Sequence, residues 1–261
     1  MVGSLLLRGM LIGIVAGIVA FGFARVFGEP QVDLAIAFEE QMAAAESAQA
    51  ADGGQAAVEE EAAEEEGLPG RGTQAGIGLA TALVVYGAAV GGIFALVFAF
   101  GYGRLGAIGA RGTSALLALA AFVSVVLVPL FKYPANPPAV SVDETIGIRT
   151  TLYFILLVIS VLGMAGAFTL ARRLWAQHGG WNATLTAAAA YLVFVAIVYV
   201  AMPAINEMPE GFSPDVLWNF RVVSVGIHVI LWAVIGLGFG VLAEKAVGED
   251  SGNARLAASY G

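Results

Sequence analysis

Six long apolar runs constrain this chain more than any other feature of its sequence. Each is close to the roughly 20 residues that a helix needs to cross about 30 Å of hydrocarbon. With a mean hydropathy of +0.85, the pattern predicts an all-α, polytopic membrane helix bundle of about six transmembrane helices, forming a single integral membrane domain over residues 1–261. The runs are Leu5–Phe23, Gly76–Phe100, Ala115–Phe131, Leu152–Leu170, Leu185–Met202 and Val222–Leu242.

The first run has two interpretations, because Arg8 and the small residues after it also suit a signal peptide. Its apolar stretch is longer than a typical signal core, and Phe27–Asp33 follows where a small-residue cleavage site is expected. We therefore expect a retained transmembrane helix. Because the sequence has no cysteine, disulfides, thiolate metal sites and a cysteine nucleophile are excluded.

Acidic charge is concentrated in one extramembrane segment. Twelve of the twenty Asp and Glu residues fall between Glu29 and Glu66, and the net charge is −8. Residues 30–75 are predicted to form an acidic, partly disordered extracytoplasmic loop, since Ala51–Gly72 has too little apolar surface to offset its ordering entropy. The sequence has no basic patch that could meet phosphate, so we expect no nucleic-acid partner.

The distribution of Lys and Arg favours one orientation. With six spans, the termini and the even-numbered loops share one side and carry seven positive charges, against five in the odd-numbered loops. The positive-inside rule then predicts that both termini are cytoplasmic and that the acidic segments lie outside.

Glycines recur at four-residue spacing on the first run, at Gly9, Gly13 and Gly17, and similar pairs lie on the second and sixth runs. Small residues at this spacing let two helix backbones approach closely. These faces could pack helices within one bundle or hold a homo-oligomer together.

The first loop is predicted to begin with a turn at Phe27–Asp33 that includes Pro30 and ends on a helix N-cap. Apolar residues then recur every fourth position from Leu34 to Met42, which indicates an amphipathic helix lying on the membrane to about residue 50. The third and fifth loops are rich in proline, which cannot continue a helix and holds the preceding residue extended. All three loops are predicted to lie on the same side.

Five carboxylates near the predicted outer mouth and one imidazole inside a predicted span are candidate ion ligands. His228 lies two turns, about 10 Å, below Arg221 on one helix face. The acids could instead solvate loops and cap helices, and the imidazole could hydrogen-bond a neighbouring helix. The carboxylates are Glu29, Asp33, Glu207, Glu210 and Asp215.

Two arginines, Arg25 and Arg221, are predicted to lie where spans meet the outer surface. They could pair with Glu29 or Glu210 and fix the loops, or extend to lipid headgroups. The sequence has no phosphate-binding glycine loop, Ser-His-Asp arrangement or zinc-protease spacing, so we expect no enzymatic activity.

Several strings, in order along nearly the whole chain, resemble the CbtA family of probable cobalt transporter subunits. They are Arg8-Gly9-Met10, Phe23–Ala37, Lys132–Val140, Glu210-Gly211-Phe212, Leu217–Arg221 and Leu231-Trp232. The residues within them that we single out are Gly9, Arg25, Pro30, Lys132, Tyr133, Pro134, Asn136, Pro137, Pro138, Trp218 and Arg221.

The resemblance implies a multi-pass subunit in the plasma (inner) membrane that takes up cobalt for cobalamin biosynthesis. It also implies a small CbtB-like partner with one transmembrane helix and histidines near its end. Imidazole and carboxylate groups bind Co²⁺, and this chain has only two histidines. We therefore expect cobalt as the transported substrate, no permanently bound cofactor, and ligands from carboxylates, a single histidine or the partner.

Two other functions remain open on the sequence: a transporter for another small solute, and a non-transporting membrane scaffold that assembles a partner. If the chain transports an ion, we expect the entrance where the outer ends of the first, third, fifth and sixth helices meet. Carboxylates would lie at the mouth, with His228 about 10 Å deeper.

Overall fold

The computed structural model describes residues 2–52, 70–106, 108–140, 143–205 and 208–248, and these residues form helices and loops without a strand. Five of the helices described are long and apolar enough to cross a membrane. The all-α membrane bundle predicted from the apolar runs is confirmed. The five helices are Val2–Ala48, Arg71–Gly101, Ala110–Lys132, Thr145–Ala201 and Pro214–Gly248.

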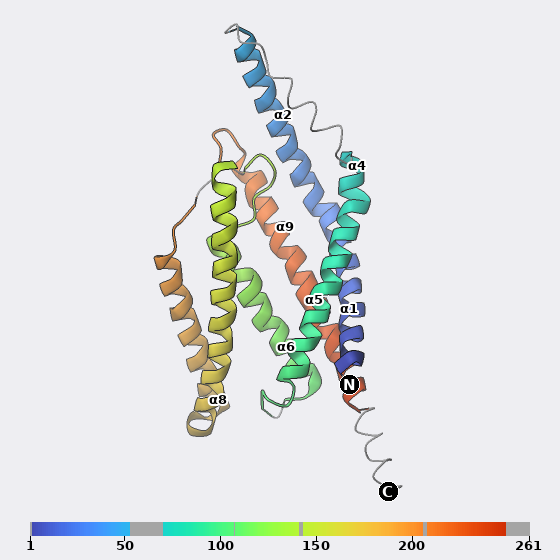
Figure 1. Ribbon diagram of the computed structural model, residues 1–261, viewed down its shortest axis with the longest axis vertical. Helices are drawn as coiled ribbons and strands as arrows, with labels where there is room; N and C mark the ends of the chain where they lie inside the picture. Colours follow the sequence, from blue (N-terminus) through green and yellow to red (C-terminus); the bar gives the residue numbers. More distant parts are fainter. Residues whose placement is uncertain (1, 53–69, 107, 141–142, 206–207, 249–261) are drawn as a thin grey trace.

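The helix labelled α8 (Asp143–Ala201) consists of two spans joined at Gly179. Its 59 residues would extend about 90 Å if straight, about three times the hydrocarbon thickness. Gly179 has a φ of 72°, a left-handed conformation that glycine adopts without steric cost. The chain reverses there (Figure 1), so the part of the chain described makes six passes.

Six passes bring the last helix back to the end of the bundle where the first begins (Figure 1). The Arg8 Nη1 of α1 (Val2–Phe23) donates to the Leu242 carbonyl oxygen at 3.0 Å. That carbonyl belongs to the helix formed by α9 (Pro214–Ala233), η4 (Val234–Gly238) and the residues to Gly248. We call this the terminal end of the bundle, and the opposite end, with residues 133–140, 202–205 and 208–213, the loop end.

The turn expected at Phe27–Asp33 is wrong. The chain continues from α1 through the π-helical turn η1 (Ala24–Gly28) into α2 (Glu29–Asp52), which projects beyond the other helices (Figure 1). Asp33 therefore lies inside a helix rather than at an N-cap. A helix is present between Leu34 and about residue 50, but as part of α2 and continuous with α1 rather than as the separate amphipathic helix that was expected. Residues 53–69 of the acidic segment lie outside the residues described.

Pro30 explains why a turn was expected and why the helix nevertheless continues. Proline has no backbone N–H, and its ring clashes with the carbonyl four residues back in a regular α-helix. Directly before it, the Glu29 N–H bonds to the Ala24 carbonyl oxygen, five residues back. This wider π-type turn accommodates the proline within a continuous helix.

The first and second spans pack with their backbones in contact. The second span is α4 (Arg71–Thr73), η2 (Gln74–Gly78) and α5 (Leu79–Gly101). A Cβ added at Gly13 would lie 2.0 Å from the Gly87 carbonyl oxygen, and one at Gly9 would lie 2.3 Å from that of Gly91. The face formed by Gly9, Gly13 and Gly17 is thus occupied within the protomer, so of the two alternatives for this face the structure shows packing within one bundle.

The main core lies among α1, α5, the third span and the last helix. Phe98 packs edge-on to Phe239 with ring centroids 5.1 Å apart, and both side chains are fully buried. The third span is α6 (Ala110–Ala121), η3 (Phe122–Leu127) and α7 (Val128–Lys132). The Ser114 hydroxyl of this span donates to the Gly236 carbonyl oxygen at 2.6 Å, which ties it to the last helix.

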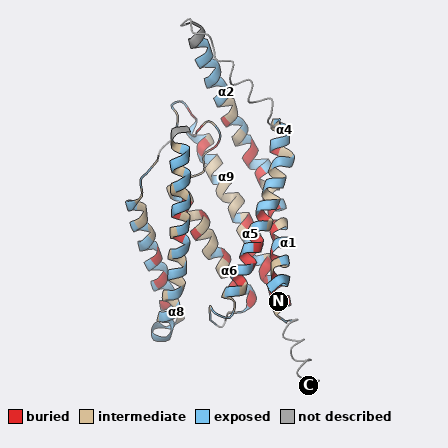
Figure 2. Cartoon of the chain, viewed as in Figure 1, coloured by how far each residue is buried: buried red, intermediate tan, exposed pale blue. Residues whose placement is uncertain are grey.

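The α8 hairpin lies at the periphery and packs mainly on the third span (Figure 1). Its two arms are joined by a 2.7 Å hydrogen bond between the Ser160 and Tyr191 hydroxyls. Most of its surface is exposed within the chain, in contrast with α1 and α5 (Figure 2). In a membrane, this exposed apolar surface faces lipid or another subunit.

Candidate functional site

The three segments predicted to lie on one side meet at the loop end. A small core separate from that of the bundle contains Ala35 of α2, Val140 of the third loop, Phe212 of the fifth loop and Leu217 from the start of the last span. Phe38 packs edge-on against Phe212 with ring centroids 5.1 Å apart. This core holds the loop end together.

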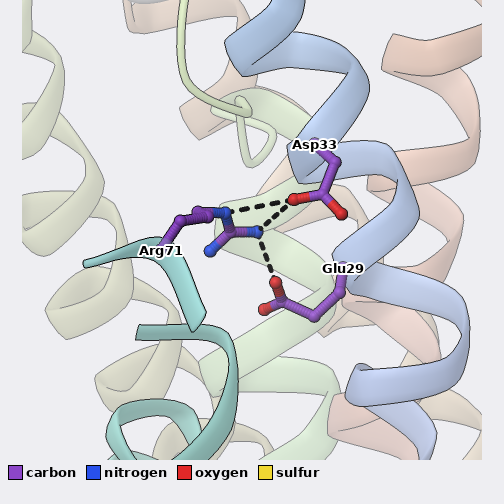
Figure 3. Close-up of polar contacts among 3 residues, drawn as sticks. All are labelled: Glu29, Asp33 and Arg71. Atoms are coloured by element: carbon purple, nitrogen blue, oxygen red, sulfur yellow. Dashed lines mark hydrogen bonds and ion pairs between the residues drawn. The ribbon is translucent and has the colours of Figure 1, made fainter. Parts of the chain in front are cut away.

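Glu29 and Asp33 share one face of α2 and bind the same guanidinium (Figure 3). The Arg71 Nη2 donates to Glu29 Oε2 and, at 2.9 Å, to Asp33 Oδ1, while Arg71 Nε donates to the same Asp33 oxygen at 3.1 Å. Glu29 is 6% exposed, and a carboxylate buried to this extent requires a cationic or hydrogen-bonding partner. We call these three residues the acidic triad.

The pairing that the sequence suggested for Arg25 and Arg221 is not the one observed. Arg25 is exposed, and Arg71 takes the place beside Glu29. Arg221 instead donates from Nε to the Ala135 carbonyl oxygen at 3.3 Å and from Nη2 to Asn136 Oδ1 at 3.0 Å. The two arginines therefore differ: one faces the surroundings, and the other fixes the third loop.

The start of the third loop is fastened to the second arm of α8. The Lys132 Nζ donates to the Tyr199 carbonyl oxygen at 2.9 Å, and the Tyr133 hydroxyl donates to the Pro203 carbonyl oxygen at 2.8 Å. Burial raises the pKa of the Tyr133 phenol, so the hydroxyl keeps its proton and remains a donor. Both acceptors lie at the end of a helix or just beyond it, where carbonyl groups lack helical partners.

The middle of the same loop is fastened to the first arm of α8 and to α9. Arg149 Nη2 donates to the Pro134 carbonyl oxygen at 3.0 Å, next to the residues that Arg221 binds. Pro137 is fully buried, whereas Pro138 is exposed. Two guanidinium groups from different spans thus satisfy the carbonyl groups of a segment whose prolines prevent a helix.

A cavity of about 340 Å³ opens beneath this loop, between α9 and the first arm of α8. His228 lines it, and the Nδ1 of its ring lies 2.8 Å from the Ser224 carbonyl oxygen. Because a carbonyl oxygen only accepts, Nδ1 carries the hydrogen in the neutral imidazole and Nε2 carries the lone pair. The cavity lining consists of Leu130, Tyr133, Pro134, Ala135, Ile146, Arg149, Thr150, Tyr153, Ser224 and His228.

The acidic triad and this cavity lie on different elements, because no residue of α1, α2 or α4 lines the cavity. Gly28, the residue before Glu29, packs against Val223, the residue before Ser224. Phe23 contacts Gly226 one turn further along. These contacts connect the helix that leads to Glu29 with the helix that carries His228.

The remaining predicted ligands do not join them in a metal cluster. Glu210 and Asp215 are exposed, in the fifth loop and in the first turn of α9, and Glu207 lies outside the residues described. Trp218 of the family-like string is also exposed, at 68%. Within the described part of the chain, no three His, Asp or Glu side chains are grouped closely enough to hold a metal ion.

Two arginines in the site, Arg71 and Arg149, were not predicted. Arg71 follows the acidic segment and begins the second span. A positive charge at the end of an acidic loop was the sequence signal that could have suggested its pairing with Glu29 and Asp33. Arg149 lies near the start of the fourth span, as Arg221 lies near that of the sixth. Their convergence on one loop depends on tertiary contacts.

The chain was also compared with known proteins. The sequence profile of the CbtA family, described as a probable cobalt transporter subunit, matches residues 2–244. No curated protein and no solved structure matches the chain. The match spans every helix from α1 to the last span, so this chain belongs to the CbtA family of probable cobalt transporter subunits.

Proposed function

We propose that the chain is a permease subunit that takes up Co²⁺ across the plasma (inner) membrane for cobalamin biosynthesis. The observation that carries this proposal is the family match over residues 2–244, which covers all six passes. Both termini are proposed to be cytoplasmic, on the charge bias of the loops, so that the loop end faces outward.

The proposed ion path begins at the acidic triad and continues to His228. Glu29 and Asp33 supply carboxylate oxygens near the outer surface, and His228 supplies an imidazole nitrogen in the cavity between α9 and the first arm of α8. Both ligand types suit Co²⁺. Weak, successive binding suits transport, because the ion has to leave each position.

A partner is proposed to supply the missing ligands. Since the residues described contain no group of three His, Asp or Glu side chains, this chain alone offers incomplete coordination. A small, single-span CbtB-like subunit with histidines near its end would complete it.

The test is uptake of radiolabelled cobalt by cells that lack other cobalt importers and express the chain together with its partner. We expect uptake that depends on the chain, reduced by Glu29→Gln and Asp33→Asn and reduced further by His228→Ala at equal protein level. Chain-dependent uptake at wild-type rates in all three variants would contradict the proposed path. Absence of chain-dependent uptake would contradict the function, and competition by other divalent ions would measure selectivity.

The incomplete coordination also favours a second candidate, a membrane scaffold that assembles a partner without conducting the ion. This role predicts that Gly13→Val, which disrupts helix packing, abolishes uptake, while the three variants above leave it unchanged.

A further inference from the structure

A second cavity, of about 310 Å³, lies between the α8 hairpin and the third span, and its lining offers no free polar side chain. Thr184 donates its hydroxyl to the Gly180 carbonyl oxygen at 2.8 Å. The Tyr191 hydroxyl is engaged by that of Ser160. A ligand of this cavity is therefore apolar, because a polar group would be buried without a hydrogen bond. The other lining residues are Leu116, Leu119, Ala120, Val123, Met164, Ala167, Phe168, Ala171, Ala187, Ala188 and Leu192.

One end of this cavity lies toward the terminal end of the bundle, where the α8 hairpin turns (Figure 1). Ala171 and Thr184 line the cavity on the two arms, and each is within about two helical turns of Gly179, where the chain reverses. The cavity thus extends from the middle of the hairpin toward the membrane surface on that side.

Arg172 lies at this end of the cavity. Residues four apart on a helix share a face, so Arg172 lies one turn beyond Phe168, which lines the cavity. Its side chain is exposed, and among the described residues it has neither an ion pair nor a hydrogen bond. Residues 145–205, which form almost the whole hairpin, contain no Asp or Glu. The hairpin therefore supplies no carboxylate to this guanidinium.

Two exposed tryptophans flank the same end. Trp175 packs on the backbone of Gly180, since a Cβ added there would lie 2.6 Å from its ring. Trp181 precedes the lining residue Thr184 by less than one turn. Tryptophan is enriched at the level of lipid headgroups, where its ring contacts apolar chains and its N–H reaches polar groups. The two tryptophans thus indicate that this end of the cavity lies at the headgroup level of the membrane.

The size of the cavity favours a lipid chain over a helix as its occupant. A transmembrane helix is about 10–12 Å across with its side chains, so one turn of it takes up roughly 400–600 Å³. The cavity holds only about 310 Å³. An acyl chain is narrower, and in a phospholipid it is joined to a phosphate, which a guanidinium binds through paired hydrogen bonds.

We propose that this cavity binds an acyl chain of an anionic phospholipid, with Arg172 on the phosphate and Trp175 and Trp181 beside the headgroup. Such a lipid adds apolar contacts between the hairpin and the third span across the cavity. The proposal depends only on the membrane bundle, so it holds whatever ion or solute the chain transports.

The test is native mass spectrometry of the full chain, released from detergent, with defined lipids added. Phosphatidylglycerol is compared with phosphatidylcholine of the same acyl chains, whose choline cation offsets the phosphate charge. We expect one phosphatidylglycerol to bind each chain at least about tenfold more tightly than phosphatidylcholine. Inorganic phosphate should not displace it, because phosphate lacks the acyl chain that fills the cavity.

Arg172→Gln should reduce this preference about tenfold, because hydrogen bonds to a charged group are lost. The matched control is Arg173→Gln, which removes the same charge at the next position. Arg173 lies one turn beyond Thr169, an exposed residue outside the lining, so its loss should reduce the preference less. Ala167→Leu fills part of the cavity without changing a charge, so it should weaken the binding of both lipids and leave their ratio unchanged.

Equal affinities for the two lipids, equal effects of Arg172→Gln and Arg173→Gln, or displacement of the lipid by inorganic phosphate would overturn the proposal. The same spectra detect a second copy of the chain or a bound single-span partner. If Ala167→Leu released either of these and left lipid binding unchanged, a protein helix would be the occupant and the proposal would be wrong.

Discussion

The first and second spans pack far more tightly than the α8 hairpin packs on the third span. Between α1 and α5, glycines bring the backbones so close that a Cβ at Gly13 would lie 2.0 Å from the Gly87 carbonyl oxygen. Between α8 and the third span, an apolar cavity of about 310 Å³ remains, with Leu119 and Ala167 among its lining residues. The hairpin is instead fastened at the loop end by polar bonds, including that of Lys132.

This difference separates a tightly packed part of the molecule from a part that borders the cavity containing His228. Close backbone packing in a membrane leaves little room for a ligand and resists displacement. The cavity that contains His228 lies where the loosely packed hairpin meets α9. The hairpin is held to the third span by polar bonds at the loop end and by a small core that contains Val128, Leu156 and Tyr191.

The largest effect is expected in the tight region. Gly13→Val places a branched side chain against the Gly87 backbone, and we expect it to lower the free energy of unfolding by at least about 3 kcal/mol. Denaturation in detergent, followed by circular dichroism, measures the change. The control is Gly22→Val on the same helix, where nothing lies within 4 Å of an added Cβ. Equal stability of the two variants would contradict the claim that α1 and α5 are held together by close backbone packing at Gly13.

An intermediate effect is expected at the acidic triad. Arg71→Met leaves the buried Glu29 carboxylate without its cation and should cost about 2 kcal/mol. This value lies between those of surface and fully buried ion pairs, because the Arg71 side chain is 34% exposed. Adding Glu29→Gln should recover much of the loss in the same denaturation assay. A double variant no more stable than Arg71→Met would show that the pair does not join α2 to α4.

The smallest effect is expected in the loosely packed region. Ala167→Leu adds volume, as Gly13→Val does, but into the cavity of about 310 Å³. We expect the free energy of unfolding to change by less than about 1 kcal/mol, because neighbouring atoms need not move. A loss comparable to that of Gly13→Val would show that the hairpin packs as rigidly as the first two spans.

The sequence predicted where the helices lie along the chain better than it predicted which helices pack against one another. Hydropathy located all six passes, including the two that meet at Gly179, because the length of apolar runs depends only on local composition. It could not show that Gly13 meets Gly87 of the same chain, since small residues at helical spacing suit any close partner. Pro30 predicted a turn, but the π-helical turn before it preserved the helix.

The candidate site was predictable only in part, for the same reason. His228 was identified because a titratable group inside an apolar run is unusual. Arg71 binds Glu29 across 42 positions of sequence, and Arg149 binds Pro134 between two spans, contacts that local patterns do not encode.

Cobalt flux through the purified chain tests the central claim most directly. The chain and its small single-span partner would be reconstituted into liposomes that enclose a metal-sensitive dye, with cobalt added outside. We predict influx above that of liposomes containing the partner alone, and a lower rate for His228→Ala at equal protein content. Influx no greater than with the partner alone, although the chain is folded and inserted, would contradict its role as a cobalt permease subunit.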